Sequence, residues 1–69
     1  MYTIYFSYNS ERTLIGSYNT HEEAIKEGIT FLKKLGYTPS KVWRHWVNHK
    51  REEWHDFGSW SAFLIVIEK

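Results

Sequence analysis

One amphipathic helix, in a chain otherwise rich in strand-favouring residues, constrains this fold more than any other feature. Thr20 precedes Glu23 by three residues, the spacing of a capping box, in which the Thr hydroxyl accepts from the Glu backbone N–H. Gly36 is suited to the left-handed conformation that ends a helix. Between them, apolar side chains or glycine recur at helical spacing, at Ala24, Ile25, Gly28, Ile29, Leu32 and Leu35. The sequence therefore predicts one helix over residues 20–35 with one side that packs on a sheet.

Segments on both sides of this helix have strand character. Residues 2–8 alternate strand-favouring side chains, and residues 13–18 follow after a polar turn. Gly16 inside the second segment indicates a bulge or a close backbone approach. Residues 60–68 contain an apolar run on both faces, which predicts an interior strand, and residues 54–57 are expected to be a short extension of it.

Residues 42–47 fit both a strand and a helix, because their apolar positions satisfy either period. The strand is favoured, since β-branched and aromatic residues dominate and a polar stretch then leads to the next strand. The predicted order is ββαββ: a two-layer α+β sandwich with a mostly antiparallel four-stranded sheet and the helix on one face. Sixty-nine residues make a single domain, 1–69.

Composition narrows the core and the setting of the chain. There is no cysteine, so no disulfide stabilises this small domain, and its aromatic content of 19% predicts a core rich in Trp and Tyr. The longest apolar run, residues 62–67, is far below the roughly 20 residues that a membrane span needs. We therefore expect a cytoplasmic protein without a membrane segment.

A single helix covers one face of a sheet, yet the strands offer apolar residues to both faces. Phe63 and Ile65 point opposite to Leu64 and Val66. Three arrangements satisfy the second face: the 36–60 connection folds over it, two copies of the chain pair through it as a homodimer, or it is a platform for a ligand or nucleic acid.

A basic and aromatic segment, residues 41–54, is the strongest candidate for contact with a partner. Net charge is only +1, but residues 41–51 carry four cations and no acid, interleaved with tryptophans. Because Trp and Tyr are enriched at interfaces, protein–protein contact with itself or a partner is the predicted function. Single-stranded nucleic-acid binding through the same segment is the alternative. The candidate contact residues are Trp43, Arg44, Trp46, Lys50, Arg51 and Trp54.

Histidines offer the chain's metal and catalytic candidates. His45 and His49 share a face in a helix, but in a strand they lie about 13 Å apart. Neighbouring residues of a strand point to opposite faces, which keeps His55 from pairing with Asp56; the latter is expected to accept backbone N–H bonds near Gly58. We predict a non-enzymatic domain with no catalytic residue, metal, cofactor or small-molecule substrate.

Four short segments together resemble small uncharacterised proteins encoded by phages and prophages of Gram-positive bacteria. They are Tyr5-Phe6-Ser7-Tyr8, Thr20-His21-Glu22-Glu23-Ala24, Leu35-Gly36-Tyr37 and Asp56-Phe57-Gly58-Ser59. The resemblance implies an accessory role during infection or lysogeny and brings no assigned catalytic residues. Trp60 departs from the pattern, which has a smaller polar residue or His at that position.

Overall fold

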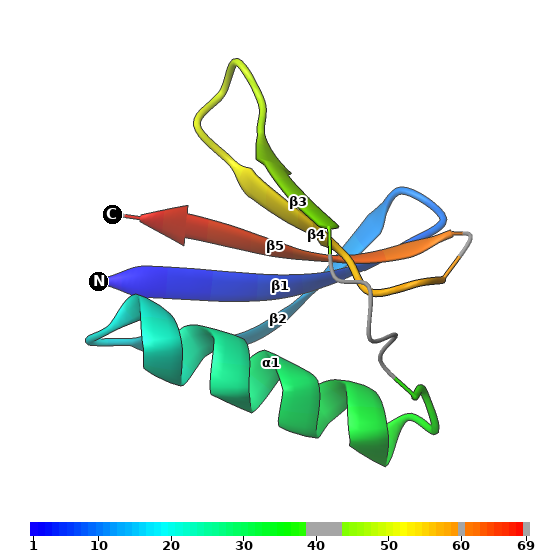
Figure 1. The fold of residues 1–69 in the computed structure, drawn as a ribbon. Coiled ribbons are helices and arrows are strands. Elements are labelled where there is room, and N and C mark those ends of the chain that lie inside the picture. Colours follow the sequence, from blue (N-terminus) through cyan, green and yellow to red (C-terminus); the bar gives the residue numbers. More distant parts are fainter. Residues whose placement is uncertain (39–43, 60, 69) are drawn as a thin grey trace.

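The chain folds into two layers, a five-stranded sheet and one helix (Figure 1). A computed structural model describes residues 1–38, 44–59 and 61–68. The strands follow the order β2-β1-β5-β4-β3, and every neighbouring pair is antiparallel. This confirms the predicted α+β class. The elements are β1 (Tyr2–Tyr8), β2 (Glu11–Tyr18), α1 (His21–Lys34), β3 (Arg44–Val47), β4 (Glu53–Asp56) and β5 (Ala62–Glu68).

The helix and the bulge lie where the sequence predicts them. Thr20 is the N-cap, and its side chain accepts from the backbone N–H of Glu23 at 3.1 Å. Gly36 follows the helix with a φ of 92°, the left-handed conformation that glycine favours. In β2, Gly16 pairs with Ile4 while Leu14 pairs with Tyr5, so the intervening Ile15 is the extra residue of a β-bulge.

The number of strands differs from the four predicted, because residues 53–56 form a strand of their own. β4 pairs with β3 on one side and with β5 on the other. After β4 the chain turns sharply: the Asp56 carboxylate accepts from the backbone N–H of Gly58, whose φ is 100°. The expected strand near residues 42–47 is confirmed as β3, although residues 42 and 43 lie outside the described part. The last strand begins at Ala62 rather than at position 60.

Within the described residues, the fully buried core contains no Trp or Tyr, contrary to expectation, although Tyr2, Tyr18 and Tyr37 pack against it. Trp46 and Trp54, the tryptophans within the described chain, lie on the sheet face away from the helix. The helix approaches the sheet closely at Gly28, where an added Cβ would lie 2.6 Å from the Ile4 Cδ1 atom. Small and medium apolar side chains fill the interior instead, at Ile4, Phe6, Ala24, Leu32, Phe57, Ala62, Leu64 and Val66.

The second sheet face is covered in part by the chain's own rings. Trp54 packs on Phe63 at 5.3 Å between ring centroids, and Trp46 stacks on Trp54 at 6.3 Å. The Arg12 guanidinium lies over the Trp54 ring at 5.9 Å and forms a two-bonded ion pair with Glu52. The described part of the 36–60 connection does not fold over this face, because residues 44–56 add two strands to the sheet.

Helix α1 is narrower than the sheet beneath it. It packs against β1, β2 and β5, whereas its backbone does not approach β3 or β4 closely within the described chain. In the view of Figure 1 the tip of the β3–β4 hairpin points away from α1. The side of the hairpin that faces the helix layer is therefore left without a helix above it.

Candidate functional site

An open groove lies where the helix stops covering the sheet, and its volume is about 640 Å³. The helix contributes an apolar wall, Ile25 and Ile29, with Glu22 and Lys26 beside it. The sheet contributes only ionisable side chains among the described residues that line this groove, and these come from β3 and β4. The groove therefore joins an apolar wall to a strongly polar one.

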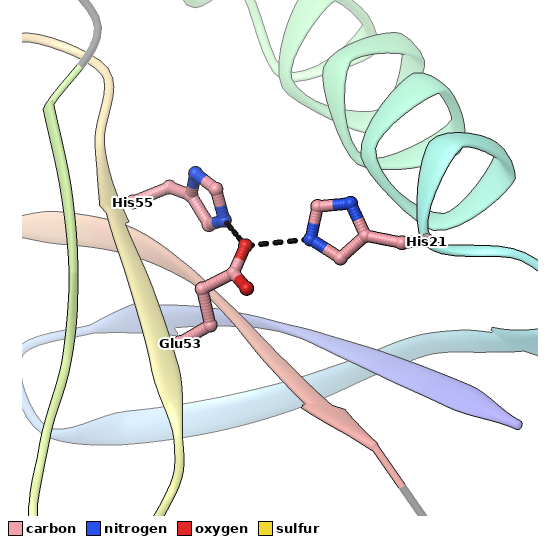
Figure 2. Close-up of side chains that lie close together, drawn as sticks. All are labelled: His21, Glu53 and His55. Atoms are coloured by element: carbon pink, nitrogen blue, oxygen red, sulfur yellow. Dashed lines mark hydrogen bonds and ion pairs between the residues drawn. The ribbon is translucent and has the colours of Figure 1, made fainter.

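Three ionisable side chains meet at one point in this groove (Figure 2). Glu53 Oε1 lies 2.6 Å from His21 Nε2 and 2.5 Å from His55 Nε2. One ligand-type atom from each of the three side chains lies within 4.8 Å of the other two. His21 is the first residue of α1, whereas Glu53 and His55 belong to β4, so the cluster links the two layers of the fold.

The local structure explains why these side chains converge. Glu53 and His55 are two apart in a strand, so they point to the same face. They pair with Val66 and Leu64 of β5, both core residues, and this register directs them toward the helix layer. His21 directly follows the N-cap Thr20, and the edge of the Tyr2 ring packs on it at 5.6 Å.

Burial and charge set the protonation of the cluster. His55 is 4% exposed, and burial lowers its pKa against the opposing effect of the Glu53 carboxylate. Burial acts to raise the pKa of Glu53, but the hydrogen bonds from His21 and His55 outweigh it, so the pKa lies below its ordinary value. Near neutral pH, Glu53 is therefore a carboxylate and His55 a neutral imidazole, the forms in which both bind metal ions.

A further histidine stands next to the cluster. His45 lies directly opposite His55 in the β3–β4 pairing, and the two rings stack with centroids 5.7 Å apart and an angle of 26° between planes. His45 also lines the groove, and it is exposed. Three imidazoles and the Glu53 carboxylate thus line this groove, one imidazole from α1 and the other three groups from β3 and β4.

Most contact residues predicted from the sequence lie elsewhere on the same hairpin, whereas Arg51 lines a second hollow together with His21 and Glu53. Trp46 and Arg44 share the face of β3 away from the groove, and Trp46 is 43% exposed where it stacks on Trp54. Lys50 and Arg51 lie in the β3–β4 connection, beyond the ends of the paired strands. Trp43 falls outside the described residues. The structure therefore brings Trp46 and Trp54 together and leaves the two turn cations beyond the strands.

The histidine pairs considered from the sequence are rearranged in the structure. His45 meets His55 across the hairpin, whereas His49 lies in the turn. Asp56 bonds the backbone of Gly58, as expected. Sequence reasoning missed the His21–Glu53–His55 cluster. Strand alternation across residues 53–55 was the signal for its β4 half, but no local pattern brings His21 to β4.

No helix in the described ranges is long and apolar enough to cross a membrane. No protein-family model, curated protein or solved structure matches this chain. The resemblance to phage and prophage proteins therefore stays a prediction, and the function must be argued from the geometry of the groove and of the hairpin.

Proposed function

We propose that this chain is a small non-enzymatic domain that binds one divalent transition-metal ion, best matched by Zn²⁺, through His21, Glu53 and His55. The observation that supports it is the convergence of three donor atoms, two imidazole nitrogens and one carboxylate oxygen, within 4.8 Å of one another. Zinc sites use these ligand types, with bond lengths of about 2.0–2.2 Å.

The cluster fits an ion after a small adjustment. Donors on a tetrahedral ion with bonds of about 2.0–2.1 Å lie about 3.3 Å apart, whereas His21 and His55 stand 2.6 and 2.5 Å from the Glu53 oxygen. The ion would replace two hydrogen bonds, so each Glu53–histidine distance would lengthen by less than about 1 Å. The widest donor pair, at most 4.8 Å apart, would close by up to about 1.5 Å. His21 and Glu53 have that freedom, because their side chains are 44% and 26% exposed at the groove.

Ligand chemistry also selects the kind of ion. Two neutral imidazoles and one carboxylate carry a single negative charge and suit first-row transition metals, whereas Mg²⁺ and Ca²⁺ prefer sets made of oxygen atoms. The groove gives the ion a path from solvent. A purely hydrogen-bonded cluster is the competing account, in which Glu53 only ties the start of α1 to β4.

Isothermal titration of the chain with Zn²⁺ separates the two accounts. We expect one ion per chain, and an increase in the free energy of unfolding of about 2.7 kcal/mol when free Zn²⁺ is 100 times the dissociation constant. Glu53→Gln and His55→Ala should lose this gain, while His49→Ala, which removes a histidine of the turn, should keep it. If about 0.1 mM Zn²⁺ gives no binding heat and no change in melting temperature, the hydrogen-bonded cluster is the account that stands.

Protein–protein contact through the hairpin, with itself or with a partner, is a second candidate function. The observation that favours it is Trp46, 43% exposed on β3, the last strand in the sheet order, and stacked on Trp54. Exposed aromatic side chains are typical anchors of interfaces. Sedimentation velocity across micromolar concentrations tests this, and a monomer throughout would count against self-association.

Single-stranded nucleic-acid binding through Arg44, Lys50 and Arg51 stays the alternative use of that hairpin. It predicts binding that weakens steeply with salt and is lost in the Arg44→Glu, Arg51→Glu double variant. An apolar protein contact through Trp46 should survive the same charge reversal. The accessory role in infection or lysogeny implied by the resemblance is compatible with either kind of contact.

A further inference from the structure

We infer that His45 is a fourth metal ligand, which turns toward the bound ion and completes a set of three histidines and one glutamate. This inference rests on the proposed metal binding by His21, Glu53 and His55 and goes beyond it in one respect. It makes the site a closed one, held by protein ligands alone, rather than a site that keeps a water or substrate position.

The position of His45 relative to His55 supports this role. Their ring centroids lie 5.7 Å apart. Two imidazoles on one tetrahedral ion, with Zn–N bonds of about 2.0–2.1 Å, have ring centres about 5 Å apart. The rings of His21 and His55, which already share Glu53, are 6.3 Å apart. The His45 ring is thus as near to His55 as the His21 ring is. It is stacked on His55, however, and its nitrogens are not in the 4.8 Å donor group, so His45 must change rotamer to reach the ion.

The backbone directs His45 to the correct side of the sheet. His45 pairs with His55, and both residues face the groove, while Trp46 faces away from it. The His45 side chain is exposed on β3, the strand at the end of the sheet order. Exposed side chains change rotamer on a fast time scale, so His45 can turn toward the ion without repacking the core.

Among the described residues, Glu22 is a second candidate for the fourth ligand, because it is an acid that also lines the groove. It directly follows His21 in the helix, where successive side chains project about 100° apart, so the two are poorly placed to bind one ion together. Glu22 is exposed in the first turn, where the helix dipole stabilises a free carboxylate. The geometry therefore favours His45.

A fourth ligand from β3 has a structural consequence. In the described chain α1 does not pack on β3, so the metal would be the link that ties the edge strand to the helix. Metal binding should then slow amide hydrogen exchange at Trp46 and Val47, which lie on β3 beyond His45. The ion would cross-link the helix and the β3–β4 hairpin.

Cobalt substitution tests the inference, with Co²⁺ as the probe because its visible absorption reports coordination. We expect His45→Ala to weaken Co²⁺ binding about tenfold or more and to reduce the visible bands. The matched control His49→Ala should leave both unchanged. Added imidazole should restore the bands of His45→Ala, because it occupies the vacated position, and should not alter those of the wild-type chain.

Each outcome has a distinct meaning. Equal Co²⁺ affinity and spectra for the wild-type chain and His45→Ala would overturn the fourth ligand while leaving the three-residue site in place. Loss of the bands in Glu22→Gln instead would overturn it in favour of that carboxylate. No Co²⁺ binding by the wild-type chain would refute both the proposed function and this inference. Equal melting temperatures without metal would show that His45→Ala is folded.

Discussion

Glu52→Gln should destabilise the protein at neutral pH and have little effect near pH 2. Glu52 is buried immediately before β4 and accepts from both terminal nitrogens of Arg12, at 2.7 and 3.1 Å. It also accepts from the Asn48 side chain at 2.9 Å. Hydrogen bonds from Arg12, and then those from Asn48, lower the pKa of Glu52 from 4.5 to about 2.

The size of the effect follows from this pKa. A fall from 4.5 to about 2 corresponds to an upper limit of about 3.4 kcal/mol between the charged and neutral forms. The Arg12 side chain is 39% exposed, so solvent screening reduces the contribution, and we expect about 1–2 kcal/mol. Because the pKa is lower in the folded state, this stability is complete above pH 4.5 and is lost as the pH falls toward 2.

Urea unfolding of the wild-type chain and Glu52→Gln at pH 7 and near pH 2 measures the difference directly. In a domain of this size, a loss of about 1 kcal/mol lowers the melting temperature by about 4–8 °C. Glu11→Gln, an exposed carboxylate at the start of β2, is the matched control and should change little. The reasoning is refuted if the destabilisation is the same at both pH values, or if Glu11→Gln matches Glu52→Gln at pH 7.

Three further predictions concern the packing, the helix start and the hairpin. Gly28→Ala should lower the free energy of unfolding by about 1 kcal/mol in a urea titration, because the clash with Ile4 at 2.6 Å outweighs the gain in helix propensity; a stabilised variant would contradict it. Thr20→Ala should cost about 1 kcal/mol in the same assay, since it removes the cap on Glu23, whereas Thr20→Ser should restore most of the loss. Trp46→Ala should change stability by less than about 1 kcal/mol, because the ring is 43% exposed, and should abolish any self-association seen by sedimentation; an associating variant would exclude this ring as the contact.

The features that the sequence predicts correctly depend on residues close together in the chain. Thr20 bonds Glu23 three residues later, and Gly36 ends the same helix, so the helix can be recognised without knowledge of the fold. β4 was merged with the last strand because it has only four residues and no alternation of apolar and polar side chains. Its identity as a separate strand depends on pairing with two neighbours, which is a long-range property.

The composition gives the number of aromatic residues, but it does not indicate which face of the sheet they occupy. Helix and sheet approach closely where Gly28 meets Ile4 and Leu64. The His21–Glu53–His55 cluster could not be predicted from local patterns either. Strand alternation places Glu53 and His55 on one face, but His21 is at least 32 residues away in the chain and meets them only in the folded structure.

The width of the sheet explains where function is to be sought. Strands lie about 4.8 Å apart and a helix is about 10 Å wide, so one helix covers two or three strands of five. On β1 and β5 the positions under the helix are apolar, as at Ile4 and Leu64. On the uncovered strands the corresponding positions are His45, Glu53 and His55, together with the exposed Val47.

A strand face that is only exposed to solvent does not require histidine, because lysine, threonine or serine would make it polar equally well. The side chains present here instead turn inward toward one another and toward the first residue of the helix, with His55 almost fully buried. Burying ionisable groups costs free energy unless they are paired, and here Glu53 pairs with both His21 and His55. The sequence predicts function on the sheet face opposite the helix. The geometry instead favours the face on which the helix packs, where β3 and β4 extend beyond its edge.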